Sequence, residues 1–339
     1  MSVADIASER RTAAGEPLVA VILVNWNAWR DVIKASQSLQ ASTYARWNLI
    51  VVDNASSDGS LDRLSVLEDR TRLIANPINS GFAGGCNIGF AEARRLGADY
   101  VFLLNCDAWV EPDCLAALVS TAGKLRNAAV LGAVVKSAEG DHLQFFGSRC
   151  SSDWGRPAWF QAPEDLKELE SALIETDFVF GAALFAPMSL LETVGDFDER
   201  FFLNFEETDW CYRARGLGFG CTVVRDAVVR HKGGASLGPG EGPLQTYFLQ
   251  RNQLLFAEKH GSFRQWSRTL RGTLKFLLSR LAGDLRAWSA RGGGFAEPTK
   301  SLLLAVRDYV FRRFGDCPPA LRGWAKQFAQ RASRSALPT

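Results

Sequence analysis

The sequence lacks an apolar stretch long enough to cross a bilayer. No hydrophobic run reaches the roughly 18 residues that a membrane-spanning helix needs, and the richest stretch, residues 178–191, is interrupted by Gly181 and Pro187. Residues 1–16 carry charges without the apolar centre of a secretory signal, so we interpret them as a disordered leader. Because 47% of the 339 residues are hydrophobic, the rest is expected to be globular. These features favour a cytoplasmic protein.

Motifs of several common protein classes are also absent. The seven cysteines are scattered without a Cys-x-x-Cys pair, which argues against structural zinc or a disulfide framework and favours reduced, buried thiols. No Gly-x-Gly-x-x-Gly follows the first expected strand, and no P-loop motif occurs. The sequence therefore does not support a dinucleotide-binding oxidoreductase or a P-loop enzyme. A nucleotide diphosphate can instead be held by a divalent cation, which needs oxygen ligands.

The net charge of +2 hides an uneven distribution. Residues 244–339 contain 17 Lys and Arg against 5 Asp and Glu, an excess of 12 positive charges, so residues 1–243 carry an excess of ten negative charges. Glycine and proline dominate residues 233–243. We therefore expect a catalytic domain over 17–243 and a basic helical region over 244–339 that binds an anionic surface.

Strand-like and helix-like segments alternate along the chain. Continuous apolar, β-branched runs are typical of buried parallel strands, and amphipathic stretches between them are typical of helices. The expected strands are 19–24, 49–52, 73–75, 100–104, 129–135, 178–185, 220–224 and 228–230, and the expected helices are 30–40, 61–67, 87–96, 113–125, 188–194 and 206–217. This alternation predicts an α/β fold with a doubly wound, mainly parallel sheet.

The first four expected strands each end at short polar side chains. These ends carry Asn25, Asp53, Asn76 and the pair Asn105 and Asp107. Each one alone is explained as a turn residue or a helix cap. Because ligands bind beyond the carboxyl ends of parallel strands, four such ends in succession favour a site.

Seven segments carry a resemblance to a known family. They are VILVNWN (21–27), VVDNASSDGS (51–60), NSGFAGGCNIGF (79–90), LLNCDAWVEP (103–112), FVFGAALFAP (178–187), GDFDERFFLNFEETDWCYRARGLG (195–218) and VVRHKGGAS (228–236). In this order they resemble the inverting family 2 glycosyltransferases, and most closely the rhamnosyltransferase-like branch. The resemblance covers about residues 17–260. It implies the nucleotide-sugar-binding fold called GT-A, a Mg²⁺ or Mn²⁺ ion, and sugar transfer from a nucleotide diphosphate.

The resemblance implies a nucleoside pocket around Asp53. This carboxylate matches the family residue that accepts a hydrogen bond from N3–H of uracil or thymine, which would select a pyrimidine diphosphate. Asn25 and Asp58 border the same pocket by this resemblance. The positions that match the turn against the ribose and diphosphate, where glycine allows close backbone approach, are Asn79, Gly81 and Asn87. The alternative is that Asp53 only caps the next helix.

The resemblance also implies a metal site. Asn105-Cys106-Asp107 falls at the family's Asp-x-Asp motif, with Asn in the first position. Asp107 then becomes the principal carboxylate ligand, and Asn105 contacts the sugar or ribose. His231 matches a family histidine that reaches the same ion, although a single histidine is usually not a ligand. With so few protein ligands, diphosphate oxygens and water would complete the coordination.

The acidic cluster at 206–209 implies the general base. Glu207 occupies the position where the family commonly has the Asp of a Glu-Asp pair, so the carboxylate is retained one methylene longer. An inverting transfer needs one such base. Asp209 is interpreted as a support or sugar contact, and as the second candidate for the base. The alternative explanation is that these acids only complement the dipole at a helix N-terminus.

Two basic amphipathic helices are expected in the tail, over 264–288 and 301–314. The stripe of the first is Trp266, Leu270, Leu274, Leu277, Leu281, Leu285 and Trp288. Such helices either pack on the catalytic domain or lie on the anionic inner face of the plasma membrane, close to a polyprenyl-diphosphate acceptor. Nucleic acid is not expected as a partner, because no binding motif accompanies the charge.

These features together predict a metal-dependent inverting glycosyltransferase of cell-surface polysaccharide synthesis. It would move a sugar, with L-rhamnose as the specific choice, from a dTDP- or UDP-sugar to a saccharide or polyprenyl-linked saccharide. A sugar-phosphate nucleotidyltransferase is one alternative, but the glycine-rich N-terminal loop with Arg and Lys is absent. A non-catalytic nucleotide-sugar or membrane-binding module is the other, and it would not need Asp107, Glu207 and His231.

Overall fold

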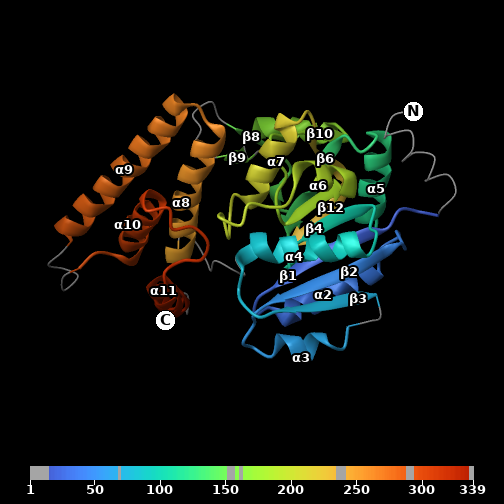
Figure 1. Ribbon diagram of the computed structural model, residues 1–339, viewed down its shortest axis with the longest axis horizontal. Helices are drawn as coiled ribbons and strands as arrows, with labels where there is room; N and C mark the ends of the chain where they lie inside the picture. The colour runs from blue at the N-terminus through green and yellow to red at the C-terminus, as the bar shows by residue number, and fades with distance from the viewer. Residues whose placement is uncertain are drawn as a thin grey trace.

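The computed structural model of the chain describes residues 15–67, 70–150, 157–159, 163–233, 242–287 and 294–335. Residues 1–14 of the expected leader (1–16) lie outside these residues. So does most of the glycine- and proline-rich stretch 233–243. Figure 1 shows a sheet with covering helices on one side of the molecule and the C-terminal helices on the other.

A mixed sheet forms the centre of the first part. Its strands are β1 (Val19–Asn25), β2 (Trp47–Asn54), β3 (Thr71–Asn76), β4 (Tyr100–Leu104), β5 (Ala108–Val110), β6 (Ala129–Ser137), β7 (Leu143–Phe145), β10 (Leu173–Glu175), β11 (Ala183–Pro187) and β12 (Gly220–His231), and β8 (Ser148–Cys150) pairs separately with β9 (Pro157–Trp159). The main path runs β10-β12-β6-β11-β4-β1-β2-β3. Strands β4, β1, β2 and β3 are parallel, as are β6 and β12, whereas β11 runs antiparallel between β4 and β6. The predicted, mainly parallel α/β sheet is confirmed.

Helices cover both faces of this sheet. They are α2 (Trp29–Gln40), α3 (Ser60–Leu64), α4 (Gly81–Arg95), α5 (Cys114–Lys124), α6 (Met188–Val194) and α7 (Glu206–Gly216), and a 3-10 helix, η1, spans Pro163–Glu170. After β3 the chain returns across the sheet to β4, on the other side of β1. Because such crossovers are right-handed, this reversal puts α4 on the face opposite α2.

The glycine-rich segment after β3 is helical from Gly81, whereas the sequence predicted a turn there and a helix only from Asn87. Glycine lowers helix propensity, which is why a turn was expected. Here the glycines let α4 contact β1: a Cβ at Gly85 would lie 2.5 Å from the Val24 side chain, and one at Gly89 would lie 2.4 Å from Ile22. Close packing therefore overrides propensity in this helix.

Two further predictions differ from the structure. The strand expected over 178–185 is confined to Ala183–Pro187, because residues 178–182 lie outside the sheet, and Phe178 and Phe180 line the cavity described below. The two strands expected over 220–224 and 228–230 are one strand, β12, with an irregularity between Val224 and Val228.

The tail consists of α8 (Pro243–His260), α9 (Phe263–Arg286), α10 (Glu297–Val310) and α11 (Pro319–Ser335). Helix α8 lies against the other three, and α9 is the outermost helix in Figure 1. Of the expected apolar stripe of α9, Leu277 is buried against its neighbours while Leu274 and Leu285 are exposed. No described helix, including the 24-residue α9, combines the length and apolar character needed to span a bilayer.

Candidate active site

The carboxyl ends of β1 and β2 join two of the predicted site residues. Pairing of these strands puts Asn25 opposite Asp53, and Asn25 Nδ2 donates a hydrogen bond to Asp53 Oδ1 at 2.7 Å. The second oxygen of Asp53 accepts from the backbone N–H of Ser56 at 3.2 Å. Both side chains are buried. Since each carboxylate oxygen has two lone pairs, Asp53 keeps capacity for a further donor at each oxygen.

Asparagines at the ends of β2 and β3, and in the turn after β3, form hydrogen bonds to one another and to the backbone of that turn. Asn54 Oδ1 accepts from Asn76 Nδ2 at 2.8 Å and from Ser80 N at 3.1 Å, and Asn54 Nδ2 donates to the carbonyl of Gly81 at 2.8 Å. Asn79 Oδ1 accepts from Gly81 N at 2.9 Å. The φ of Gly81 is 74°, and a Cβ there would lie 2.3 Å from a backbone oxygen, so only glycine fits. These bonds fix the shape of the sheet edge.

Two predicted nucleotide-binding residues make local contacts away from the Asn25–Asp53 pair. Asp58 is exposed and accepts from the backbone N–H of Ser60 at 3.0 Å, within its own turn. Asn87 lies inside α4, where its amide accepts from Phe197 N at 2.9 Å and donates to Glu199 Oε1 at 2.9 Å. Asn87 therefore ties α4 to the loop that precedes α7.

The two predicted metal ligands face each other. His231 ends β12, and its Nε2 lies 3.2 Å from Asp107 Oδ1 and 3.3 Å from Asn105 Nδ2. Asp107 is 3% exposed and His231 is 6% exposed. The structure thus brings together all three residues that the sequence assigned to the metal and sugar, although they come from the distant segments 105–107 and 231.

Gln144 of β7 orients the ring of His231. Its Nε2 donates to the backbone carbonyl of His231 at 2.9 Å, which leaves Oε1 facing His231 Nδ1 at 2.9 Å. Because an amide oxygen only accepts, Nδ1 donates its proton to Gln144, and this contact turns Nε2 toward Asp107. Sequence reasoning missed Gln144, because only the pairing of β7 with β6 brings it here.

This donor set fits a divalent cation. His231 Nε2 and a carboxylate oxygen of Asp107 lie 3.2 Å apart, both are atoms that can bind a divalent cation, and the glutamine supplies the second interaction that metal-bound histidines usually have. The described residues contain no group of three or more His, Cys, Asp or Glu that could hold a metal ion. Further ligands would therefore come from a bound diphosphate and from water.

Glu207 lies in the first turn of α7 with one oxygen unpaired. Its Oε2 is buried without a hydrogen-bond partner. Burial raises the pKa of Glu207, although the N–H groups of Gly181 and of the first turn lower it in part. Neighbouring Glu206 is buried too, and burial together with the charge of Glu207 raises its pKa well above the usual range. A carboxylate with a raised pKa is a stronger base.

One short segment lies between Glu207 and the pair formed by Asp107 and His231. The ring of Phe180 packs edge-on against His231, with 5.8 Å between centroids. The next residue, Gly181, approaches Glu207 so closely that a Cβ on it would lie 3.4 Å from the Glu207 Cγ. The candidate base and the candidate metal ligands therefore flank the same two residues.

Asp209 points into the interface with α8. It is fully buried, with Oδ1 at 2.6 Å from Lys259 Nζ and 2.8 Å from His260 Nε2, and Oδ2 at 3.0 Å from Arg213 Nε. Burial alone would raise the pKa of Asp209, but His260, Lys259 and Arg213 together lower it. Asp209 thus links α7 to α8, and Glu207 is the carboxylate with an oxygen left for a substrate.

The loop before α7 is held by two buried residues of α8. Three loop residues have left-handed φ angles of 63°, 68° and 76°: Phe202, Asn204 and Phe205. Asn252 Nδ2 lies 2.8 Å from each of three carbonyl oxygens of residues 201–204. Arg251, which is 0% exposed, donates to the carbonyl of Phe201 at 3.1 Å. These contacts stabilise a strained loop that positions Asn204 and Glu207.

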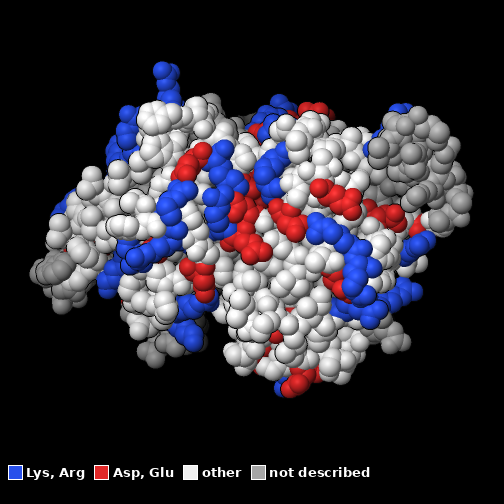
Figure 2. Space-filling model, viewed as in Figure 1, with Lys and Arg blue, Asp and Glu red and all other residues white. Residues whose placement is uncertain are grey.

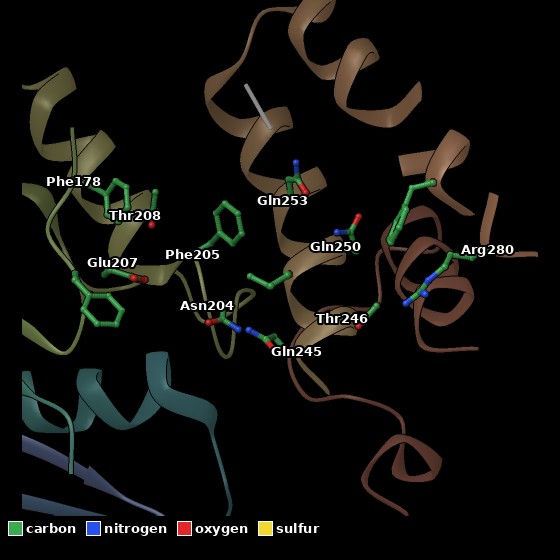
Figure 3. A pocket seen from close by; sticks show the side chains of 13 residues that line it. Phe178, Asn204, Phe205, Glu207, Thr208, Gln245, Thr246, Gln250, Gln253 and Arg280 are labelled. Atoms are coloured by element: carbon green, nitrogen blue, oxygen red, sulfur yellow. The ribbon is translucent and has the colours of Figure 1, made fainter. Parts of the chain in front are cut away.

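A cavity of about 300 Å³ opens beside Glu207 (Figure 3). Aromatic side chains, including Phe178 and Phe205, form part of its wall, and one face of α8 adds amide side chains such as Gln250. Asn204 Nδ2 is buried in this wall without a hydrogen-bond partner. Buried unpaired donors and acceptors between aromatic rings suit a ligand rich in hydroxyl groups.

Comparison with known proteins gives the family of this chain. Residues 20–190, half of the chain, match the family described as "Glycosyl transferase family 2", and the chain belongs to this family. It is 22% identical over 277 residues to the N-acetylglucosaminyl-diphospho-decaprenol L-rhamnosyltransferase of Mycobacterium tuberculosis, covering 76% of this chain and 89% of that protein. It is 23% identical over 219 residues to the dTDP-rhamnosyl transferase RfbF of Shigella flexneri, covering 62% and 71%.

The fold agrees with a solved glycosyltransferase. The mannosyltransferase PcManGT from Pyrobaculum calidifontis, solved with GDP-Man and Mn²⁺, superposes with a TM-score of 0.53 at 14% identity, covering 91% of this chain and 94% of that one. Identity this low establishes only the fold. The predicted GT-A fold, with helices added at the C-terminal end, is confirmed.

Proposed function

We propose that this protein is a metal-dependent, inverting glycosyltransferase that transfers L-rhamnose from a dTDP- or UDP-sugar to a saccharide or polyprenyl-diphosphate-linked saccharide. The observation that carries the proposal is the buried, unpaired Glu207 oxygen beside a 300 Å³ cavity, with the Asp107–His231 pair across one short segment. The names of the two relatives support the choice of sugar and of acceptor.

The donor would bind along the carboxyl ends of β1 to β4. Asp53, oriented by Asn25 at 2.7 Å, would accept a hydrogen bond from the imide N–H of uracil or thymine. Cytosine and the purines present different groups at this position, so the carboxylate would favour a uridine or thymidine diphosphate.

Glu207 would act as the general base. It takes the proton from the acceptor hydroxyl while that oxygen attacks C1 of the donor sugar from the face opposite the leaving diphosphate. The new bond to C1 forms as the bond between C1 and the diphosphate oxygen breaks, so the configuration at C1 inverts. Asn204, whose amide nitrogen is buried without a partner, would orient the acceptor hydroxyls.

Asp107 and His231 would hold a Mg²⁺ or Mn²⁺ ion. When bound, such an ion neutralises charge on a departing diphosphate. The protein's part is to keep the two ligands in place: Gln144 holds the ring of His231 through Nδ1 at 2.9 Å, which directs the Nε2 lone pair at the site.

The tail would hold the enzyme on an anionic membrane. On the outer side of α9, Phe263, Leu278 and Leu285 are 79%, 66% and 61% exposed. Arg271 and Lys275 flank them on the same helix. Figure 2 shows Lys and Arg gathered over the C-terminal helices and acidic side chains near the centre. Exposed apolar residues next to cations suit an anionic lipid surface.

A thermal-shift screen tests the proposed donor. With Mn²⁺ present, dTDP-rhamnose or UDP-sugars should raise the melting temperature of the protein, because a ligand that binds only the folded state stabilises it. GDP-mannose should not, and Asp107→Asn should remove the dependence of the shift on Mn²⁺. An equal shift with GDP-mannose would refute the role given to Asp53.

A further inference from the structure

The cavity beside Glu207 is bordered by a cation from the tail. Arg280 of α9 reaches the cavity from the side opposite Glu207, and Thr246 and Gln250 of α8 lie between them (Figure 3). The guanidinium carbon of Arg280 lies 5.5 Å from the ring centroid of Phe276, one turn earlier on α9, and this ring also lines the cavity. The sheet and the tail therefore contribute opposite charges to one cavity.

Arg280 has no counter-charge within the described residues. No described Asp or Glu lies within ion-pair distance of Arg280, and the guanidinium of Arg280 makes no hydrogen bond to any described residue. Arg251 on the neighbouring helix, by contrast, donates to carbonyl oxygens of Gly315 at 2.7 Å and of Phe201 at 3.1 Å. A half-buried guanidinium with free donors suits a phosphate, which it can bind through two parallel hydrogen bonds.

The middle of the cavity is neutral and polar. Gln250 is 6% exposed and makes no hydrogen bond through its amide in the described part of the chain, and Gln245 and Gln253 line the same wall. Amide groups both donate and accept, as sugar hydroxyls do. The chemistry therefore changes along the cavity from a carboxylate, through amides, to a guanidinium.

We infer that this cavity binds an acceptor that carries a phosphate group: the attacking hydroxyl meets Glu207, the sugar ring lies among the amides of α8, and the phosphate binds Arg280. The inference rests on the proposed function and specifies its acceptor as a glycosyl phosphate or diphosphate. The donor's diphosphate is not the anion concerned, because Asn25, Asp53 and Asp107 do not line this cavity.

Arginine variants test the inference in transfer assays with two phosphorylated probes, N-acetylglucosamine 1-phosphate and the 1-diphosphate of the same sugar on a short prenyl chain. Arg280→Gln should raise KM for both by about tenfold or more with little change in kcat, since a hydrogen bond to a charged group contributes about 1.5–3 kcal/mol. Arg280→Lys should keep part of the affinity. Arg264→Gln is the matched control, because Arg264 is exposed on the same helix and does not line the cavity.

Binding measured by calorimetry separates this inference from the proposed function. N-acetylglucosamine without phosphate should bind wild type and Arg280→Gln equally weakly, and the 1-phosphate should bind only wild type tightly. Unchanged KM and affinity in Arg280→Gln, at an unchanged melting temperature, would overturn the inference. If no dTDP- or UDP-sugar is turned over, the proposed function fails, whereas Arg280-dependent binding of the 1-phosphate still stands. Tighter binding of the prenyl probe than of the 1-phosphate identifies a lipid acceptor, and equal binding identifies a free sugar phosphate.

Discussion

At the scale of single residues, two nearby carboxylates of α7 differ in their surroundings and therefore in the direction of their pKa shifts. Glu207 keeps a buried oxygen without a partner, and burial raises its pKa. Asp209, two residues further along α7, is surrounded by three basic side chains that lower its pKa. Two acids in one turn thus have pKa values shifted in opposite directions, which fits the proposal that Glu207 transfers the proton and that Asp209 keeps its charge.

The raised pKa of Glu207 predicts an acid limb in the rate. The base must be ionised to accept a proton, so kcat/KM should fall as the pH drops through the pKa of Glu207. Because burial raises that pKa above the ordinary value of 4.5, the midpoint should lie above pH 4.5. Initial rates over a pH series at saturating Mn²⁺ measure it. A rate that stays constant down to pH 4.5 would contradict this assignment.

Gln144→Leu should weaken the affinity for Mn²⁺ by about 10- to 100-fold, as losses of such supporting contacts usually do. The reason is that His231 Nδ1 would lose its acceptor at 2.9 Å, and the ring its orientation. Gln144→Glu retains an acceptor at this place and serves as the control. Titration of activity with Mn²⁺ gives the affinity; an unchanged midpoint in Gln144→Leu would show that the glutamine does not support the site.

The sequence could predict the residues of the site that lie in motifs, and not those that reach it through tertiary contacts. Asp107 and His231 were predicted from their segments, and they meet at 3.2 Å. Gln144 and Arg280 lie in no recognisable motif, and only the pairing of β7 with β6 and the placement of α9 bring them to the site. Asn87 lies in a motif and was predicted as a nucleotide contact, but in the structure its amide forms hydrogen bonds to residues 197 and 199.

At the scale of elements, amphipathic periodicity does not predict the bounds of a helix that is buried on several sides. Most strands of the first half were predicted within a few residues, since continuous apolar runs mark them. The region 244–339 was expected to be helical, but the bounds of α8 were not predicted, because buried residues such as Gln250, Arg251 and Asn252 surround its axis rather than forming one stripe. Burial of Arg251 is possible because backbone carbonyls of other elements and the side chains of Tyr247 and Asn252 accept its hydrogen bonds.

Because α4 and β1 are in close contact, replacing a glycine of α4 by alanine should lower the free energy of unfolding at that position. Gly89→Ala should lower the free energy of unfolding by about 1–3 kcal/mol, the usual penalty for overpacking, because the new Cβ would lie 2.4 Å from Ile22. Gly123→Ala is the matched control: Gly123 is also helical, in α5, and a Cβ added there would meet nothing within 4 Å. Urea denaturation of both variants compares them. Equal stability of the two would mean that α4 does not contact β1 so closely.

At the scale of the whole molecule, charge separates the two parts of the chain. The basic excess of residues 244–339 belongs to the part of the chain that contains α8 to α11, and the acidic excess belongs to the part that contains the sheet. The same helix α9 exposes Leu278 outward and directs Arg280 to the cavity. The proposed membrane contact and the proposed acceptor site would thus lie on two sides of one element.

Vesicle sedimentation tests this arrangement. The full chain should co-sediment with phosphatidylglycerol vesicles at low salt and less at high salt, because each Lys or Arg near an anionic surface contributes about 1 kcal/mol. Leu278→Ser should reduce binding, whereas Leu217→Ser, at a similarly exposed leucine beside α7, should not. Equal binding by both variants would show that the outer face of α9 is not the contact surface.

The central claim is that Glu207 accepts the proton from the acceptor, and the comparison of Glu207→Gln with Asp209→Asn tests it most directly. Glu207→Gln keeps the shape and removes the proton acceptor, so kcat should fall by about a hundredfold or more while the affinity for the donor stays nearly unchanged. Asp209→Asn should lower the melting temperature instead, because Lys259, His260 and Arg213 lose their shared partner. Near wild-type turnover in Glu207→Gln, together with an inactive but fully folded Asp209→Asn, would contradict the account and make Asp209 the base.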